Sequence, residues 1–593
     1  MSELDTVRAY HQRSKHALAR YAAGPETLDW DAQPDPWRRY AGAPDLPLPL
    51  LQPETLRATW PQLGQPGAVP AQPCQLQSLG ALLQLALGLS AWKTQGPDRW
   101  AVRHNPSSGN LHPTEAYVLS RGWPGLADGL HHYAPREHAL AQRAALRSVP
   151  GGASEPSTPS APSAPITSGA PAALWLGLSS IHWREAWKYG ERAFRYCQLD
   201  LGHALGALRY AAAVLGWRLL PLPSVPHATL AALLGLDRAA DFAGVEPEEP
   251  ELLLQLLPGP HALPLPLPAA TDLAAWAGRA NRLDAHPMYR WPVIDEVARA
   301  TRRQAVPVSE ASGGAIPPTD PPTDAPKDPP TDAPTDAQAA APAAAPAAAP
   351  LAVAVIQQRR SAQRFERRAP MAAAELQQLA QALLPEAGLP WDMAAEHGAA
   401  AEADAAAAAG AHAAARARVH PVFFVHRVDG WAPGAYLLPR DAGAAQRLAP
   451  ALGADLLWQP VPGSPLLLLA ANPALAGTLR TLCCHQALGS DANIAVALLG
   501  ELDATLAEQG AWGYRALLQE AGLLGQVLYL QAEALGHRGT GIGCFFDDAL
   551  HSLLGMADTR LQTLYHFTLG TAVDDPRIAS TPPYAGLRQE NPA

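Results

Sequence analysis

Cysteine and long apolar runs are scarce in this chain of 593 residues. Its cysteines are too few for a disulfide framework in a chain of this length; they are Cys74, Cys197, Cys483, Cys484 and Cys544. No uninterrupted apolar stretch reaches the roughly 18 residues that a membrane span needs, so the sequence predicts no such span. The N-terminus is polar and lacks the apolar core of a signal peptide. We therefore expect a cytoplasmic protein.

Charged residues are also sparse, at 17% of the chain, against about 25% in typical soluble domains. The net charge is -10, and no run is dense in lysine and arginine. We therefore expect neither nucleic acid nor an anionic membrane as a partner. The G-x-S-x-G, H-E-x-x-H and P-loop motifs are missing. Because the histidine and cysteine clusters lack the spaced partners of a zinc site, we predict no metal.

Proline and glycine are abundant by contrast, with 61 and 47 residues, or 108 of 593. Proline is densest between residues 311 and 350, where P-T-D and A-A-A-P repeats block helix formation and offer nothing bulky to pack. We predict a linker over residues 304–350, extended at about 3.1 Å per residue. Residues 150–171 and 394–418 are further low-complexity stretches, which we interpret as surface insertions.

The linker separates two predicted domains, residues 1–303 and 351–593, that share an order of features. Each begins with a basic segment that we expect to be helical, followed by a strand-like stretch and a tyrosine-bearing turn. Each then has a long apolar helix ending in A-x-x-L-G, predicted over Tyr189–Trp217 and Tyr514–Gly536. Small residues in the middle of both would let another helix approach closely. This order indicates a repeat of two α+β domains; the alternative is a chance likeness.

A loop dense in hydrogen-bond donors, RHNPSSGNLHPTEAYVL, starts at Arg103 in the first half and leads into a predicted strand. The hydroxyls of Ser107 and Ser108 and the amide of Asn110 flank a permissive glycine. Such a loop suits recognition of a polar ring edge or a phosphate. The alternative is a tight loop before a strand.

The second half offers two motifs. If QRRSAQRF is helical, Arg359 and Gln363 share one face and Ser361 lies near the helix start, an arrangement that suits a phosphate. A solvated basic helix end is the alternative. In GTGIGCFF, Gly541 and Gly543 would let a flat ligand approach the backbone, although the spacing is not that of the dinucleotide fingerprint.

Lys188 and Tyr189 stand next to each other, just ahead of the first long helix. A lysine desolvated beside a tyrosine could act as a general acid or base. Surface exposure and packing are the alternative interpretation of the pair.

Taken together, these motifs resemble the nitroreductase superfamily of flavin enzymes, and most closely its SagB/ThcOx-type dehydrogenases, which oxidise azolines to azoles in modified peptides. The resemblance is carried by RxxPSSGNLHP, KYGERAFRY, RRS, GIGCF, DPR and PPY, which span Arg103–Pro113, Lys188–Tyr196, Arg359–Ser361, Gly541–Phe545, Asp575–Arg577 and Pro582–Tyr584. It implies two tandem domains, each a mostly antiparallel sheet flanked by helices. It also implies that the two form an intramolecular pseudo-dimer with FMN between them.

By this resemblance, Arg359, Ser361 and Arg577 would hold the phosphate and ribityl end of FMN. Gly541 and Gly543 would lie against its ring. Four residues would reach across from the first half, namely Arg103, Ser107, Ser108 and Asn110.

The sequence departs from the family at two points. Gln363 stands where family members often have lysine or arginine, so it would stabilise the reduced flavin less. The first half has no glycine segment after its long helix, so we expect one complete flavin site. The opposite site would keep only Arg13 and Ser14.

The resemblance also implies an activity. The Lys188-Tyr189 pair matches one implicated in azoline dehydrogenation, so one of the two would remove a proton while flavin N5 accepts hydride from a peptide azoline or similar substrate. One alternative is an NAD(P)H-dependent reductase of nitroaromatics or quinones. The other is a flavin-free scaffold or peptide-binding partner. The expected partners are a small-molecule or peptide substrate and a peptide-modification complex.

Overall fold

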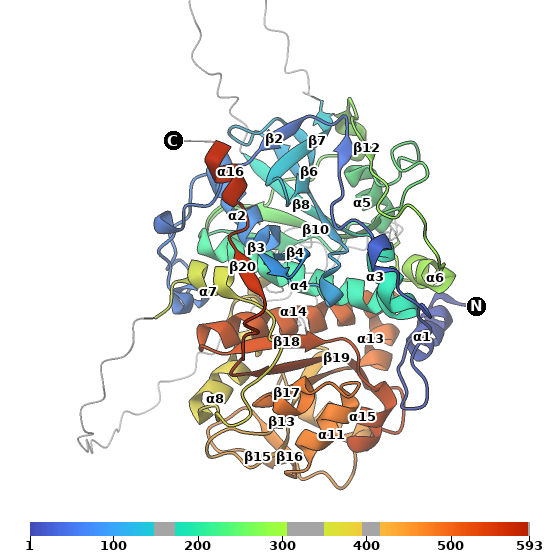
Figure 1. Cartoon of the computed structure of the whole chain (residues 1–593), viewed down its shortest axis with the longest axis vertical. Coiled ribbons are helices and arrows are strands. Elements are labelled where there is room, and N and C mark those ends of the chain that lie inside the picture. Colours follow the sequence, from blue (N-terminus) through green and yellow to red (C-terminus); the bar gives the residue numbers. More distant parts are fainter. Residues whose placement is uncertain (148–171, 305–348, 394–415, 591–593) are drawn as a thin grey trace, which may run out of the picture.

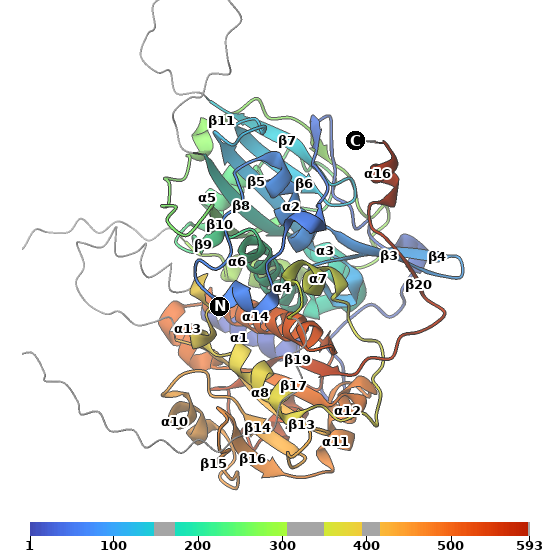
Figure 2. The ribbon, with the colours of Figure 1, turned by 90° about the vertical axis from the view of Figure 1, so that its left-hand side faces the viewer.

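The computed structural model describes residues 1–147, 172–304, 349–393 and 416–590. The predicted linker (304–350) and the low-complexity insertions at 150–171 and 394–418 therefore lie almost wholly outside the described residues. The described residues include one large sheet in each half of the chain. A central pair of helices, α4 and α14, lies between the two sheets (Figures 1 and 2).

The first half contains an antiparallel sheet with the strand order β11-β7-β6-β5-β8-β10-β9, in which β2 also pairs with β7. Every residue of β8 is buried, as a central strand with both faces covered requires. The strands are β2 (Asp45–Pro47), β5 (Thr114–Arg121), β6 (Gly129–Ala134), β7 (Ala139–Leu146), β8 (Ala173–Ser180), β9 (Arg218–Pro221), β10 (Glu249–Leu257) and β11 (Leu273–Ala274).

The second half contains an antiparallel sheet with the order β15-β16-β14-β13-β17-β19-β18. Its strands are β13 (Val419–Val425), β14 (Gly434–Leu437), β15 (Gln459–Pro460), β16 (Leu467–Ala471), β17 (Ile494–Gly500), β18 (Arg538–Ile542) and β19 (Gln562–Gly570). The path β6-β5-β8-β10-β9 recurs here as β14-β13-β17-β19-β18. The predicted tandem α+β fold with antiparallel sheets is therefore confirmed.

Helices flank both sheets (Figure 1). Those of the first half are α1 (Glu3–Arg13), α2 (Leu76–Leu87), α3 (His182–Tyr189), α4 (Ala193–Val214), α5 (His227–Leu234) and α6 (Pro292–Ala300). Those of the second half are α7 (Ala352–Gln358), α8 (Ala373–Ala382), α10 (Ala444–Leu448), α11 (Leu475–Leu482), α12 (Leu488–Asp491), α13 (Leu502–Gln509), α14 (Gly513–Ala534), α15 (Asp547–Leu553) and α16 (Ala585–Glu590). In the described parts of the chain, no helix is both long and apolar enough to cross a membrane.

The first long helix starts later than its sequence predicts. A helix was expected from Tyr189, but α3 ends at that residue, where Gly190 adopts a φ of 55°. A short 3₁₀ turn then leads into α4 at Ala193. Left-handed backbone ends α-helices and favours glycine, so Gly190 separates Tyr189 from α4.

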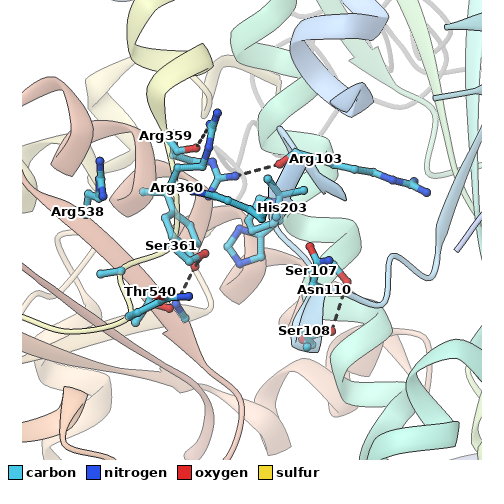
Figure 3. Close-up of a pocket in the computed structure, with 18 of the residues that line it drawn as sticks. Arg103, Ser107, Ser108, Asn110, His203, Arg359, Arg360, Ser361, Arg538 and Thr540 are labelled. Carbon is cyan, nitrogen blue, oxygen red and sulfur yellow. Dashed lines mark hydrogen bonds between the residues drawn. The ribbon is translucent and has the colours of Figure 1, made fainter. Parts of the chain in front are cut away.

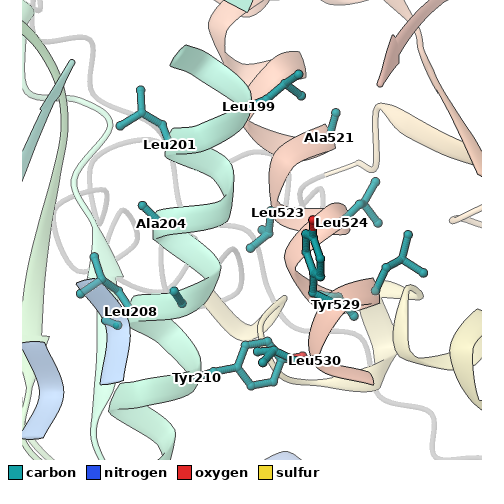
Figure 4. Packing of buried hydrophobic residues seen from close by; sticks show 14 of the residues in the cluster. Leu199, Leu201, Ala204, Leu208, Tyr210, Ala521, Leu523, Leu524, Tyr529 and Leu530 are labelled. Carbon is teal, nitrogen blue, oxygen red and sulfur yellow. The ribbon is translucent and has the colours of Figure 1, made fainter. Parts of the chain in front are cut away.

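Helices α4 and α14 are each 22 residues long and pack against each other at the centre of the molecule (Figure 4). Gly202 is the tenth residue of α4 and Gly522 the tenth of α14, and the two meet at the crossing point. A Cβ on Gly202 would lie 2.8 Å from the Cα of Gly522 and would overlap the carbonyl oxygen of Gln519. The glycines therefore allow this close backbone approach.

Terminal segments cross from each half to the other (Figures 1 and 2). Near the C-terminus, β20 (Ala579–Thr581) pairs with β3 (Leu89–Gln95) of the first half, which in turn pairs with β4 (Asp98–Arg103). At the N-terminus, His11 of α1 lies 3.0 Å from both Tyr514 and Gln562 of the second half. A smaller pairing joins β1 (Tyr40–Ala41) to β12 (Arg279–Ala280).

Candidate active site between the two halves

A cavity of about 950 Å³ lies between the two halves (Figure 3). The first half contributes the loop around Ser107–Asn110 and three side chains of α4, Tyr196, Asp200 and His203. The second half contributes residues 357–363, the edge strand β18 with the residues after it, and residues between 572 and 580 near the C-terminus. Nine of the ten predicted cofactor-binding residues line it, namely Arg103, Ser107, Ser108, Asn110, Arg359, Ser361, Gln363, Gly541 and Gly543.

Hydrogen bonds with neighbouring residues hold the Ser107–Asn110 loop in place. The backbone N–H of Ser108 donates to both carboxylate oxygens of Asp200, at 3.1 and 3.2 Å, and its hydroxyl donates at 3.1 Å. Ser107 Oγ accepts the N–H of His112 at 2.8 Å, and Asn110 Nδ2 donates to Ala101 O at 2.8 Å. Most of the loop's polar groups are thus used to fix its shape.

Lys188 and Tyr189 press against the same loop. A Cβ on Gly109 would lie 2.6 Å from Tyr189 Oη and 3.2 Å from Lys188 Nζ, and Gly109 has a φ of 59°. Glycine is therefore required here by both space and conformation. Tyr189 lines the cavity, whereas Lys188 lies just behind the loop.

Burial changes the proton affinity of the groups near this loop. Burial lowers the pKa of Lys188 and raises that of Tyr189. Burial raises the pKa of Asp200 to about 7, opposed by the hydrogen bonds from Ser107 and Ser108. Burial and the nearby Asp200 also raise the pKa of Glu185. The neutral form of Lys188 and the protonated forms of Asp200 and Glu185 are therefore easier to reach than the ordinary pKa values of these residue types suggest.

Arg103 contributes backbone rather than charge to the cavity. Its side chain points away from the other labelled cavity residues (Figure 3). The guanidinium is buried, donates to Pro36 O at 2.8 Å and lies over the Trp37 ring. Its carbonyl oxygen accepts a hydrogen bond from Arg359 Nη2 at 3.1 Å. Arg103 thereby positions Arg359.

Positive charge gathers around Arg359. This residue is 3% exposed, and among the described residues its Nε and Nη1 have no hydrogen-bond partner. Three further cations line the same cavity, namely Lys93, Arg360 and Arg538. Burial lowers the pKa of Arg359, Arg360 and Lys93, with that of Arg360 at about 10. Glu533 lines this region too, and Arg538 is paired with Asp574.

The segment after α7 corrects one prediction. Residues 359–365 were expected to be helical, with Arg359 and Gln363 on one face, but α7 ends at Gln358. Arg359 is the C-cap with extended backbone, and Phe365 forms a β-bridge with Ala572. No helix N-terminus therefore stands behind Ser361; its hydroxyl instead lies 2.9 Å from Tyr529 Oη.

Gly541 in β18 and Gly543 just after this strand leave room for two tyrosine side chains. A Cβ on Gly541 would overlap Tyr565 Oη, and a Cβ on Gly543 would overlap the Tyr196 ring. β18 is an edge strand, so one side of its backbone is not paired in the sheet. On that strand, the N–H of Gly541 donates to Tyr529 Oη at 3.0 Å.

Besides Lys188, three predicted residues do not line the cavity. Arg577 is exposed and forms an ion pair with Asp575 at 2.7 Å. Arg13 pairs with Glu191, and the Ser14 carbonyl accepts from Arg192. Arg192 also donates to Gly543 O, so Ser14 lies behind the glycine segment. Arg13 and Ser14 are therefore engaged in contacts with the 3₁₀ turn ahead of α4, and their expected place in an opposite site stays a prediction.

Several cavity residues were missed from the sequence, chiefly Lys93, Tyr196, Asp200, His203, Tyr529 and Arg538. His203 lies 3.1 Å from Tyr565 Oη and 3.2 Å from Gln526 Oε1, and burial lowers its pKa to about 3. The polar residues within the apolar helices α4 and α14 were the available signal, because a buried polar side chain needs partners.

Residues 72–245 match the nitroreductase family. No curated protein matches the chain. A crystal structure from Anabaena variabilis ATCC 29413, described as a nitroreductase, is similar over 96% of this chain and 99% of its own, with 20% identity and a TM-score of 0.62.

Two other solved structures are similar over smaller parts. The E. coli microcin synthetase McbBCD complex with truncated pro-MccB17 shares 13% identity over 37% of this chain and 70% of that chain, with a TM-score of 0.26. The NADPH:FMN oxidoreductase from Vibrio harveyi, complexed with NAD+, shares 14% identity over 38% and 70%, with a TM-score of 0.22. Residues 72–245 thus match the nitroreductase family, and the chain as a whole has a nitroreductase-like fold.

Proposed function

We propose that this chain is an FMN-dependent oxidoreductase and that the cavity between its halves holds the cofactor. The observation that carries the proposal is the buried Arg359 guanidinium, whose Nε and Nη1 lack partners among the described residues. Leaving these buried N–H groups of a charged side chain without partners is costly, and a bound phosphate would accept hydrogen bonds from them. Lys93, Arg360 and Arg538 line the same cavity and would add to that attraction. The fold and the family match support the same conclusion.

The residues present fit FMN. Arg359 and Arg360 would hold the phosphate, and Ser361 would bind the adjoining hydroxyl-bearing chain. The backbone of Gly541 and Gly543 would lie beside the flat ring, and the Tyr565 and Tyr196 side chains, which occupy the space next to these glycines, would form part of the same wall. When bound, FMN supplies hydride transfer at its N5.

We further propose the dehydrogenase version of this activity, acting on a peptide azoline or a similar substrate. Lys188 is the proposed proton acceptor because its pKa is lowered, so the neutral amine forms more readily. Since Lys188 lies behind the loop, it would take the proton through Tyr189, which lines the cavity. Tyr189 has a raised pKa and stays protonated, so it would donate a hydrogen bond in the cavity. The Gly109 contact fixes the place of both side chains.

Reconstitution with FMN tests the cofactor. We expect a flavin spectrum, and we expect Arg359→Ala to weaken FMN binding by about 10- to 100-fold, since a hydrogen bond to a charged group contributes about 1.5–3 kcal/mol. Arg560→Ala, at an exposed arginine paired with Asp558, is the control and should leave the Kd unchanged. A colourless protein after reconstitution would instead support a flavin-free scaffold.

Assays with two kinds of substrate distinguish the proposed dehydrogenase from the alternative reductase. Flavin reduction by a peptide azoline, lost in Lys188→Met while FMN binding persists, would support the dehydrogenase. Rapid NAD(P)H consumption with a quinone or nitroaromatic, unaffected by Lys188→Met, would instead support the reductase.

A further inference from the structure

Two cysteines lie close together beside the cavity. Cys544 follows the glycine segment and lines the cavity, and it is partly exposed. Cys484 lies in the turn that follows α11. All five cysteines of the chain are free thiols in this structure.

One backbone and one side-chain hydrogen bond join the segments that carry the two cysteines. The N–H of Phe546 donates to Leu482 O at 2.8 Å, and Gln486 Nε2 donates to Cys544 O at 3.4 Å. Cys484 comes two residues after Leu482, and Cys544 comes two residues before Phe546, so the two cysteines lie on neighbouring stretches of chain. Hydrogen bonding from the Cys484 thiol lowers the pKa of Cys544 and raises that of Cys484.

His16 supplies a second donor to Cys544. Its Nδ1 accepts the backbone N–H of Ala22 at 2.9 Å, so the ring proton of the neutral form is on Nε2. The ring is then oriented to donate to Cys544, and the Arg192 guanidinium adds positive charge nearby. The hydrogen bond from Cys484, the one from His16 and the charge of Arg192 lower the pKa of Cys544 to about 5.

The other cysteines are in different surroundings. Burial raises the pKa of Cys483 to about 12, and it raises the pKa values of Cys197 and Cys74 as well. Because the thiolate is the reactive form, Cys544 should differ from the rest in reactivity.

We propose that Cys544 is a peroxide-reactive thiolate and that Cys484 is its resolving partner, so that the pair forms a reversible disulfide beside the cavity. The Cys544 sulfur attacks one oxygen of a hydroperoxide and the O–O bond breaks, which gives a sulfenic acid and, after protonation, water or an alcohol. The Cys484 thiol then attacks the sulfenic sulfur and a second water leaves. Sulfur is oxidised and peroxide reduced, and neither step requires bound flavin.

Peroxide treatment of the full-length protein tests the pair. We expect hydrogen peroxide to give a Cys484–Cys544 disulfide, detected by mass spectrometry of a non-reducing digest and lost on reduction. In Cys484→Ser, the sulfenic acid should persist on Cys544 and be trapped by dimedone. Cys74→Ser is the matched control and should still form the linkage. If Cys484→Ser gave no dimedone adduct on Cys544, the proposal would be overturned.

The pH dependence of alkylation gives an independent readout in the untreated protein. The titratable and charged groups that face the pair are His16, Tyr21, Tyr189, Arg192, Tyr196 and Asp547. Labelling of Cys544 by iodoacetamide should change less than about twofold between roughly pH 6.5 and 7.5, whereas the rate for an ordinary thiol rises about tenfold. A tenfold rise at Cys544 would contradict the proposal.

Discussion

At the scale of single residues, the cavity is built from charges that the fold buries at a cost. Arg359 retains unpaired N–H groups, and Asp200 retains its carboxylate beneath the Ser107–Asn110 loop. Burying a charge without a full set of partners lowers the stability of the folded protein, so groups of this kind indicate a functional site. The consequence for Asp200 can be measured without knowing the substrate.

Asp200 should make the stability of the protein depend on pH. Its folded-state pKa of about 7 lies above its ordinary value of 3.8, so the folded protein binds more protons between these values. Stability therefore falls as the pH rises from about 4 to about 7, by up to about 1.4 kcal/mol per pH unit. Asp200→Asn keeps an oxygen acceptor for Ser108 and should flatten this fall.

Thermal or denaturant unfolding across this pH range checks the prediction. Asp98→Asn, at an exposed carboxylate, is the matched control and should keep the wild-type slope. Equal pH dependence in Asp200→Asn and wild type would show that Asp200 is ionised in the folded protein without cost.

At the scale of elements, the two long helices determine how the halves meet. Gly202 and Gly522 contact each other through their backbones at equivalent positions of α4 and α14. Around this point, Gln519 Nε2 donates to Gln198 Oε1 at 2.8 Å, and His203 reaches Tyr565 and Gln526. Tyr196, Asp200 and His203 of α4 also line the cavity, so the helix crossing and the site are coupled.

Gly202→Ala should destabilise the whole molecule. The added Cβ would meet backbone atoms of α14, which cannot move aside as a side chain can, and overpacking typically costs about 1–3 kcal/mol or more. Gly477→Ala is the control, because Gly477 lies within α11 with open space around it and should gain about 0.5–1 kcal/mol. Equilibrium unfolding measures both; a neutral Gly202→Ala would mean that the helices separate easily.

The sequence predicted long, apolar elements better than short ones. The long helix predicted from Tyr514 is α14, found within about two residues at either end, because its apolar side chains specify it locally. The segment after Gln358 was expected to be helical from spacing alone. There, a long-range β-bridge to Ala572 and the hydrogen bond from Arg359 to Arg103 determine the backbone, and neither is visible in local sequence. Asp200 was missed for the same reason.

At the scale of the whole molecule, the two halves have the same plan but different chemistry. β9 begins 25 residues after the start of α4, and β18 begins 25 residues after the start of α14. The residues that correspond to Gly539, Thr540 and Gly541 are therefore Leu219, Leu220 and Pro221. The side chains of Leu219 and Leu220 cover the backbone of this strand, and Pro221 has no N–H to donate, so a flat ligand has no backbone to lie against here.

A second difference lies on the long helices. Arg209 is the seventeenth residue of α4, and Tyr529 is the seventeenth of α14. Whereas Tyr529 faces the cavity, Arg209 is buried and forms an ion pair with Asp392 from the second half. The protein's own side chains therefore fill the position that corresponds to Tyr529.

The whole chain should for this reason bind one FMN. Titration of the full-length protein is expected to saturate at one flavin per chain, since the glycines and Tyr529 occur in the second half alone. Gly541→Leu should abolish this binding, because its side chain would collide with Tyr565 and occupy the cavity wall. Pro221→Gly, at the corresponding position of the first half, should leave the stoichiometry at one, and circular dichroism confirms that both variants fold. Saturation at two flavins, or half of the binding retained in Gly541→Leu, would show that the first half keeps a working site despite Leu219, Leu220 and Pro221.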